Sequence, residues 1–407
     1  MSLGNEFKEI VGTIGWIRKF KLNYYSGMAM PWNSLITMAL VVFSTALTNL
    51  LHAAPPAGPL VPESEVAGAI ERGYAVIQKG VKNYPEHREC FSCHHQSLPL
   101  VAFSLNGRKS LEADSTEFLN SELARSILKF TEESFEPKIA LMHQGSGVGG
   151  RALTAAYGLW TLDVGGAPRN ETIDAMVEYL LKTQAEDGAW EFQSHRPPAA
   201  SSRTMTTAIA VYGLRAFGFD KSKKSRTEDA LKKSAAFSEQ HVLDGSHEEL
   251  IGGLWLDQML VSEQAISSDI AKKRLAARTE ELWQRQQTDG GWAQTSEMIS
   301  DPYATGQALV MLAQLDDSNS IHQREPFQRG IRYLLKSQEP DGSWHVVTRS
   351  KPVQVYFDNG DPHGKDQFIS MMATCWSTAA LANFQSAGKQ PLESFQVRAR
   401  QRSLAGE

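Results

Sequence analysis

The sequence predicts an all-α protein, an α/α toroid in which six helical hairpins place one ring of helices inside another. The main observation is a seven-residue phrase, Gln-x-x-Asp-Gly-x-Trp, whose copies begin 102 and 52 residues apart and so fit a period of about 51 residues. An amphipathic helix pattern precedes each copy, and a smaller, more apolar helix pattern follows it. A fixed period of this length indicates stacked supersecondary units. The repeated positions are Gln184, Asp187, Gly188, Trp190, Gln286, Asp289, Gly290, Trp292, Gln338, Asp341, Gly342 and Trp344.

Each unit is expected to run from an outer, charged helix through an Asp-Gly turn and a loop to an inner helix. Glycine ends the outer helix because it adopts the left-handed conformation at little cost. Apolar spacing predicts further outer helices over 66–81, 123–133 and 228–241. The inner helices, rich in Ala, Gly, Thr and Ser, are predicted over 97–105, 152–162, 204–217, 249–261, 303–315 and 368–384. The units fill residues 63–388, followed by a tail over 389–407, although an open superhelix of helix pairs has the same kind of period.

The repeated phrase resembles the QW motif of squalene–hopene cyclases and, more loosely, the repeats of protein prenyltransferase β subunits in the terpenoid cyclase superfamily. The resemblance implies a closed α/α toroid in which the Gln and Trp side chains tie one hairpin to the next. It does not bring an activity with it. The cyclases protonate their substrate with an Asp-x-Asp-Asp motif that this chain lacks, and Ala373 stands where the zinc-binding His of the prenyltransferases would align.

The N-terminal segment is typical of an exported protein. Arg18, Lys19 and Lys21 precede an apolar stretch over 35–47, and small residues follow at Ala53 and Ala54. This order predicts a signal peptide within residues 1–54 and a periplasmic or other extracytoplasmic location, with membrane attachment only if the segment stays uncleaved. The net charge of −5 argues against nucleic acid as a partner.

A Cys-x-x-Cys-His motif at Cys90, Cys93 and His94 is the attachment signature of a c-type haem. Two thiols add to the haem vinyl groups, and the His ligates the iron from one side. This favours a redox or electron-transfer role with a redox partner protein, and His143 or His363 is the candidate ligand on the other side. A Cys90–Cys93 disulfide or a structural metal clip are the plainer interpretations.

Cys93 and Gln96 also have the spacing of the internal thioester in complement-like thioester domains, which are α/α toroids too. That resemblance implies an attachment module, although those domains usually carry Gly-Glu where this chain has two histidines.

The long loop before the last inner helix carries four polar candidates for metal binding or acid–base catalysis, Asp358, Asp361, His363 and Asp366. A solvated turn is the plainer interpretation of this loop. Aromatic residues of the inner helices are candidates to line a central cavity that holds an apolar or isoprenoid ligand, and plain core packing is their alternative. They are Tyr157, Trp160, Tyr212, Trp255, Tyr303, Phe368 and Trp376. A terpenoid-cyclase-like or prenyltransferase-like enzyme, or an isoprenoid-binding protein, is therefore the alternative to the redox role.

Overall fold

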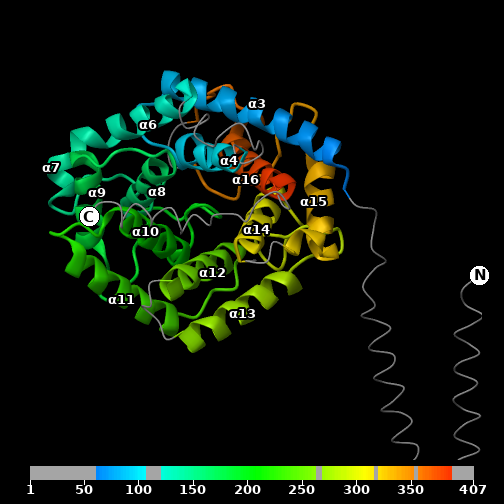
Figure 1. The fold of residues 1–407 in the computed structure, drawn as a ribbon. Helices are drawn as coiled ribbons and strands as arrows, with labels where there is room; N and C mark the ends of the chain where they lie inside the picture. Colours follow the sequence, from blue (N-terminus) through cyan, green and yellow to red (C-terminus); the bar gives the residue numbers. More distant parts are fainter. Residues whose placement is uncertain (1–60, 107–120, 263–267, 316–319, 353–355, 387–407) are drawn as a thin grey trace, which may run out of the picture. The chain divides into compact units, whose positions relative to one another are not determined.

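The computed structural model describes residues 61–106, 121–262, 268–315, 320–352 and 356–386, and these residues form an α/α toroid (Figure 1). Contacts divide the chain into Met1–Ala57 and Gly58–Glu407, and all described residues belong to the second unit. The predicted export segment and the tail over 389–407 lie outside the described residues. Within the described part, no helix combines the length and the apolar character that crossing a membrane requires.

Outer and inner helices alternate along the described part of the chain, as the hydrophobic spacing predicts. The outer helices are α3 (Glu63–His87), α6 (Glu122–Phe135), α9 (Glu171–Thr183), α11 (Lys224–Gln240), α13 (Ser268–Gln284) and α15 (Glu325–Ser337). The inner helices are α4 (Leu98–Asn106), α8 (Arg151–Val164), α10 (Arg203–Phe217), α12 (His247–Ser262), α14 (Pro302–Leu315) and α16 (Gln367–Ser386). Short turns complete the set: η1 (Cys93–Ser97), η3 (Glu136–Lys138), α7 (Ile139–Met142), η4 (Ile321–Gln323) and η5 (Gly364–Asp366).

The inner ring is closed. Each inner helix contacts the next one along the chain, and the last, α16, packs against the first, α4, and against α3. Small residues make these contacts close. A Cβ atom on Gly252 of α12 would lie 2.5 Å from the backbone N of Met205 in α10, and one on Gly306 of α14 would lie 2.7 Å from that of Ser377 in α16. The all-α toroid predicted from the repeats is confirmed, and the open superhelix is excluded.

The glutamine of each repeated phrase ties its hairpin to the next outer helix. Its Nε2 donates to the carbonyl O of the phrase's own glycine and to a carbonyl O in the neighbouring helix. The neighbouring acceptors are Ala230 O (2.9 Å) for Gln184, Pro326 O (2.7 Å) for Gln286 and Ala69 O (2.9 Å) for Gln338. Because Ala69 belongs to α3, the third copy joins the last hairpin to the first and closes the outer ring.

The tryptophan of each phrase is fully buried and anchors the turn to its own outer helix. The indole Nε1 donates to a carbonyl O near the end of that helix: Leu180 (2.8 Å), Leu282 (2.7 Å) and Leu334 (2.8 Å) for Trp190, Trp292 and Trp344. The backbone N of each Trp donates to a threonine hydroxyl of the following inner helix. The structural role that the resemblance implies for these residues is therefore observed in all three copies.

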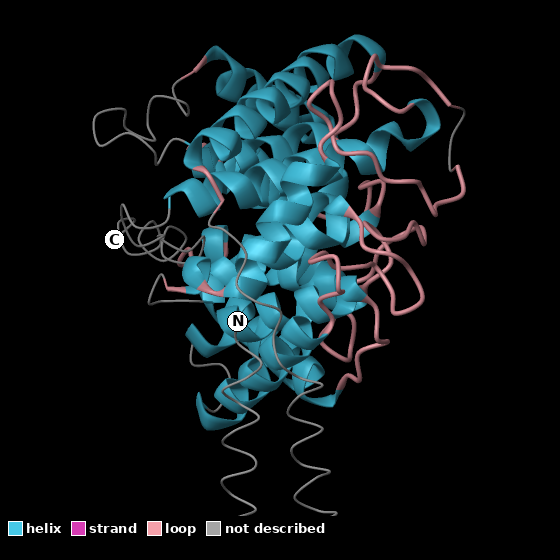
Figure 2. Cartoon of the chain, turned by 90° about the vertical axis from the view of Figure 1, so that its right-hand side faces the viewer, coloured by secondary structure: helices cyan, strands magenta, loops and turns pink. Residues whose placement is uncertain are grey.

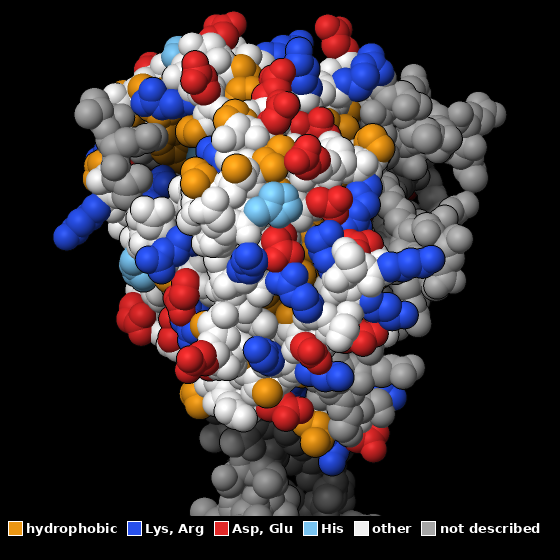
Figure 3. Space-filling model, turned by 90° about the vertical axis from the view of Figure 1, so that its left-hand side faces the viewer, with side chains coloured by type: hydrophobic (Ala, Val, Ile, Leu, Met, Phe, Trp, Pro, Cys, Tyr) orange, Lys and Arg blue, Asp and Glu red, His pale blue; other side chains and the backbone are white. Residues whose placement is uncertain are grey.

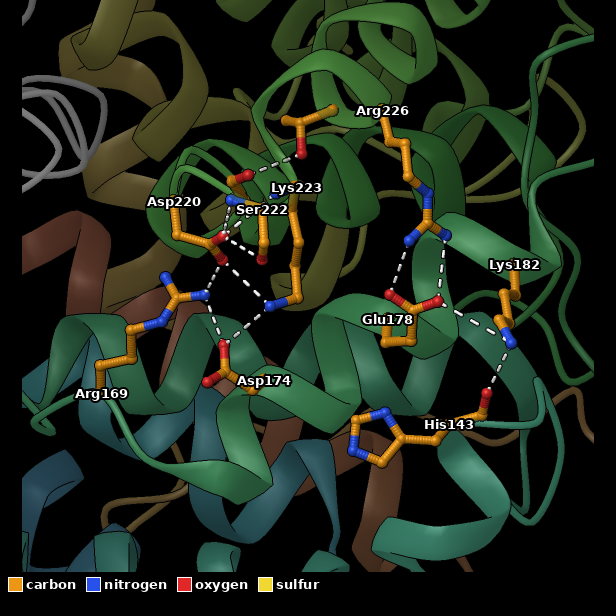
Figure 4. A network of polar contacts seen from close by, with 11 residues as sticks. His143, Arg169, Asp174, Glu178, Lys182, Asp220, Ser222, Lys223 and Arg226 are labelled. Atoms are coloured by element: carbon orange, nitrogen blue, oxygen red, sulfur yellow. Dashed lines mark hydrogen bonds and ion pairs between the residues drawn. The ribbon is translucent and has the colours of Figure 1, made fainter.

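Ion pairs link the outer helices on the solvent side. Between α9 and α11, Lys223 Nζ lies 3.3 Å from Asp174 Oδ1 and 3.0 Å from Asp220 Oδ2, and Arg169 contacts both carboxylates (Figure 4). These pairs are partly exposed and contribute little stability individually. The face in Figure 3 carries acidic and basic side chains interspersed with neutral ones.

Candidate functional site

The connections from outer to inner helices gather on one side of the ring (Figure 2). We call the end of the inner ring on this loop side the mouth. Two loops from different hairpins meet there, because Ser350 Oγ donates to Pro197 O (2.8 Å), and Arg349 Nε donates to Gln294 Oε1 (2.8 Å) in a third loop. The loops thus form a connected cover over the inner helices.

Aromatic side chains line a cavity inside the inner ring. The unfilled space among the lining residues is about 380 Å³, counting the part open to solvent. The space is narrow, so an occupant larger than a few water molecules requires side chains to move apart. The lining residues are Tyr157, Trp160, Met205, Ile209, Ile251, Trp255, Gln307, Val310, Met311, Gln314 and Trp376. Of the seven aromatics considered from the sequence, Tyr157, Trp160, Trp255 and Trp376 line this cavity. Tyr212 and Tyr303 lie in the surrounding core, and the half-buried Phe368 packs against the His94 ring instead.

A buried carboxyl group lies at the mouth end of this cavity. Glu248, the second residue of α12, accepts a hydrogen bond at Oε2 from the hydroxyl of Tyr303 (3.0 Å). Its Oε1 is buried and has no hydrogen-bond partner among the described residues. Burial raises the pKa of Glu248 to about 7, and Tyr303 and Gln307, which favour the charged form, offset only part of this effect. Glu248 is not itself a lining residue of the cavity, but its partner Gln307 is, so one side chain connects the carboxyl to the cavity lining.

The neighbouring acid, Glu249, has a different environment. Its two oxygens accept hydrogen bonds from the backbone N (3.3 Å) and the hydroxyl (2.5 Å) of Thr204, at the start of α10. The carboxylate therefore satisfies a helix N-terminus of the adjacent hairpin, which is a structural role. Glu248 is not among the site residues predicted from the sequence. The available signal was a pair of acids in the first turn of an otherwise apolar inner helix.

The Cys-x-x-Cys-His segment also lies at the mouth, in the turn that leads into α4. Cys90 is exposed, Cys93 begins the π-helical turn η1, and Cys93 Sγ lies 3.8 Å from His94 Nδ1. All three cysteines of the chain are free. Burial raises the pKa of Cys93 to about 11 and lowers the pKa of His94 well below its usual value. Both groups are therefore neutral at pH 7, and they do not form a thiolate–imidazolium pair.

The side chains of this segment have the chemistry to hold a c-type haem, but the residues around them leave no space for its porphyrin. His94 is neutral and its Nε2 is buried without a partner among the described residues, which suits an iron ligand. The space beside it is filled, because the rings of Phe368 and His95 lie 4.9 and 4.6 Å from the His94 ring. A porphyrin therefore fits only if Phe368 and the loop before it move.

The structure brings neither candidate for the opposite iron ligand into contact with His94 among the described residues. His143 is exposed at the end of α7, where its backbone O accepts a hydrogen bond from Lys182 Nζ (2.7 Å; Figure 4). His363 stacks on His345 at 4.3 Å, and its Nε2 lies 2.7 Å from Ser343 Oγ.

The four polar candidates in the last loop take separate places. Asp361 is buried and pairs with His95 Nε2 at 2.7 Å, which ties the loop to the first hairpin. Asp366 pairs with His345 Nε2 at 3.1 Å, and Asp358 accepts a hydrogen bond from Gly360 N (2.9 Å). Within the described residues, no three His, Cys, Asp or Glu side chains form a group that could hold a metal ion.

Gln96, the thioester candidate, is buried in the same turn as Cys93. Its Oε1 accepts a hydrogen bond from the backbone N of Ser92 (2.7 Å). This bond gives the glutamine a structural role that needs no thioester.

Residues 249–350 match the family model of the squalene-hopene cyclase C-terminal domain. Drimenyl diphosphate synthase from Streptomyces showdoensis is 24% identical over 186 residues, which cover 46% of this chain and 24% of that protein. Dammaradiene synthase from Dryopteris crassirhizoma is 35% identical over 68 residues, covering 14% of this chain and 10% of that protein. The chain thus spans about a quarter or less of the length of these curated relatives.

Solved structures with a similar helical fold include a type II terpene cyclase from Scytonema in complex with geranylgeranyl dihydroxybenzoate, with a TM-score of 0.49 and 12% identity over 79% of this chain and 98% of that one. A possible member of the GH105 family from Klebsiella pneumoniae has a TM-score of 0.49 and 11% sequence identity. The match covers 82% of this chain and 96% of that one.

Proposed function

We propose that this squalene-cyclase-like toroid binds an apolar molecule of the isoprenoid class in its central cavity, and that Glu248 donates a proton to it. The observation that carries the proposal is the buried Glu248 carboxyl, which interacts with Gln307 of the aromatic cavity lining and has one oxygen without a partner among the described residues. The two curated relatives are, by their names, synthases of drimenyl diphosphate and dammaradiene, which supports the same class of ligand.

The chemistry follows from the placement of the acid. The Glu248 proton adds to one carbon of a C=C double bond, whose π electrons form the new C–H bond. Glu248 becomes a carboxylate and the other carbon becomes a cation. The cation then either loses a proton from a neighbouring carbon, or bonds to a water molecule that releases a proton; in both cases the released proton restores the Glu248 carboxyl. With a pKa of about 7, a large fraction of Glu248 is protonated at neutral pH and available as an acid.

The raised pKa keeps the proton on Glu248 but does not make it a stronger acid, so the cavity has to stabilise the cation. The faces of Trp160, Trp255 and Trp376 supply this stabilisation, because a desolvated cation over an indole ring gains roughly 2 kcal/mol or more. The Trp160 and Trp255 rings lie 4.9 Å apart, so a cation beside one ring is close to the second.

Product analysis tests this function. The full chain is incubated with squalene, farnesol or geranylgeraniol, and extracts are examined by gas chromatography with mass spectrometry for isomers of the probe. We expect a cyclised or isomerised product that disappears in the Glu248→Gln variant. The Glu239→Gln variant, at an exposed position on α11, is the control and should keep the product. Equal product from both variants would remove Glu248 from the mechanism. If no probe is converted and none changes the tryptophan fluorescence, the proposed cavity function is wrong.

We propose covalent haem c as a second candidate, supported by the unpartnered His94 Nε2 beside two free thiols. Cys90 and Cys93 would hold the group through thioether bonds and His94 would ligate its iron. When bound, it would supply one-electron redox chemistry. This candidate requires the exported location proposed from the N-terminal segment.

The visible spectrum of the full chain, expressed with the machinery for c-type cytochrome maturation, tests the haem. An absorption band that survives denaturation and is lost in the Cys90→Ala/Cys93→Ala double variant is expected. A colourless folded protein of unmodified mass contradicts it, and a mass lower by one ammonia would indicate the Cys93–Gln96 thioester instead.

A further inference from the structure

Part of the cavity lining is polar and lacks hydrogen-bond partners. Gln307, Trp255 and Trp376 line the cavity, and each side chain is more than nine-tenths buried. The Oε1 atom of Gln307 and the Nε1 atoms of both tryptophans have no partner among the described residues. Buried polar groups are hydrogen-bonded in nearly all proteins, so a molecule bound in the cavity is the expected partner of these three atoms.

Helix geometry places Gln307 on the cavity side of α14. Gln307, Val310, Met311 and Gln314 all line the cavity, and their spacing of i, i+3, i+4 and i+7 puts them on one face of that helix. Gln307 also interacts with the Glu248 carboxyl. Its side chain therefore lies between the acid and the apolar part of the lining.

The two indole donors come from helices that neighbour α14. Trp255 belongs to α12 and Trp376 to α16, and both helices contact α14. Their rings flank the Trp160 ring, with centroids 4.9 Å (Trp255) and 6.5 Å (Trp376) from it. Two donors and one acceptor from three adjacent inner helices thus surround the same cavity.

The lining matches a neutral group rather than an ionised one. The described lining residues include no Lys, Arg or His, and the nearest carboxyl group, Glu248, is negatively charged once it loses its proton. A hydroxyl group has one O–H donor and two acceptor lone pairs. It is therefore complementary to one amide oxygen and two indole N–H groups.

We propose that the cavity ligand is a neutral isoprenoid alcohol, whose hydroxyl group donates a hydrogen bond to Gln307 Oε1 and accepts one from the indole N–H of Trp255 or Trp376. This inference rests on the proposed cavity function and adds the polar group by which the ligand is selected. A hydrocarbon of the same shape leaves all three atoms unpaired. A site of this kind discriminates against an analogue that lacks the hydroxyl group.

Three probes of similar length test the hydroxyl group in the full chain. Farnesol donates and accepts hydrogen bonds, farnesyl methyl ether only accepts them, and farnesene does neither. Binding is measured by equilibrium dialysis with mass spectrometry, and Gln307→Met removes the acceptor while it keeps the length of the side chain. We expect this variant to bind farnesol about ten times more weakly, a change of about 1.4 kcal/mol, and to bind the ether and farnesene as the native chain does.

The indole donors are tested by Trp255→Phe and Trp376→Phe, which keep an aromatic ring without the N–H group. We expect one of these variants to weaken the binding of farnesol and of the ether several-fold relative to farnesene. Gln78→Met, on the exposed face of α3, and Trp283→Phe, on α13 and not among the cavity-lining residues, are the matched controls. Both should leave the relative affinities of the three probes unchanged.

The outcomes separate this inference from the function on which it rests. If Gln307→Met weakens all three probes equally, or none of them, Gln307 does not bind a ligand hydroxyl group. Water that satisfies these atoms in the native chain gives that same result, which overturns the inference and leaves the cavity function standing. Should Gln307→Met fail to fold, equal effects on all three probes in both tryptophan variants overturn it instead. If none of the probes binds the native chain, the cavity function fails and this inference fails with it.

Discussion

The repeated turns and the mouth both lie in the connections between outer and inner helices, but they differ in how many of their polar atoms have hydrogen-bond partners. In the turns, each Gln, Asp and Trp side chain has a partner: the Gln bonds the next outer helix, the Asp bonds the backbone of its own turn, and the Trp bonds the outer helix of its own hairpin. At the mouth, several buried polar atoms have none among the described residues: Glu248 Oε1, His94 Nε2, Gln294 Nε2, Asp301 Oδ2 and both ring nitrogens of His247. Each unsatisfied buried polar group lowers the free energy of unfolding by about 1–3 kcal/mol. The mouth therefore destabilises the fold, whereas the turns stabilise it. The turns therefore build the ring, and the unsatisfied atoms of the mouth are consistent with the proposed ligand site.

The largest expected effect is at the turn that closes the ring. In Gly342→Ala, the new Cβ atom lies 2.6 Å from Arg72 O and the residue must adopt a φ of 92°. Backbone atoms cannot move aside cheaply, so we expect a loss of about 4 kcal/mol, from left-handed strain of about 1–2 kcal/mol plus the clash. Urea unfolding of the native chain and of Gly342→Ala measures this difference in the free energy of unfolding.

Gly245→Ala is the matched control for that change. Its φ of 85° is similar, but nothing lies within 4 Å of the new Cβ atom, so only the backbone strain is expected. Equal losses at the two glycines would show that the close approach to α3 is unimportant.

The next effect belongs to the mouth and depends on pH. The pKa of Glu248 is raised to about 7 in the folded chain, so its proton stabilises the fold fully below the pKa of the unfolded chain, and this contribution is lost as the pH rises through 7. Asp301, whose burial raises its pKa to about 6, acts in the same direction. Glu248→Gln should therefore lose less stability than the native chain between pH 4.5 and 8.5, by about 3 kcal/mol.

Urea titrations at the two pH values measure this difference, with Glu239→Gln as the exposed control. His247, whose pKa burial lowers to about 3, destabilises the fold only in acid, and it does so equally in all three proteins. If native chain and Glu248→Gln lose the same stability, the carboxyl of Glu248 is not buried as the structure has it.

Local signals explain why the fold could be predicted and part of the site could not. Helix positions follow from the spacing of apolar residues along one segment, and the predicted inner helices agree with the observed ones to within a few residues. Ring closure required the resemblance to cyclase repeats, and the bond from Gln338 to Ala69 now shows it directly.

The site depends on contacts between hairpins that no single segment reveals. The motif at Cys90 and Cys93 and the cavity tryptophans could be picked out by residue type. Glu248 and Glu249 are both buried and differ only in their partners from other hairpins, which are Tyr303 and Gln307 for Glu248 and Thr204 for Glu249. The acids of the last loop are close together in sequence, but in the structure Asp361 pairs with His95 and Asp366 pairs with His345.

The smallest expected effect compares two copies of the same turn. Gln338 and Gln286 make equivalent hydrogen bonds. Each donates to a carbonyl O of the next outer helix. Gln338 accepts a hydrogen bond from Arg72, and Gln286 accepts one from Arg329. Replacing either by Ala leaves buried carbonyls unsatisfied, so each variant should lose about 2 kcal/mol. Only Gln338→Ala opens the joint between the last and first hairpins, so hydrogen exchange should rise in α3 for that variant and in α15 for Gln286→Ala. Faster exchange in α3 for both variants would mean that the ring opens as a whole, in which case the turns act together and the mouth cannot loosen for a ligand without weakening the joints.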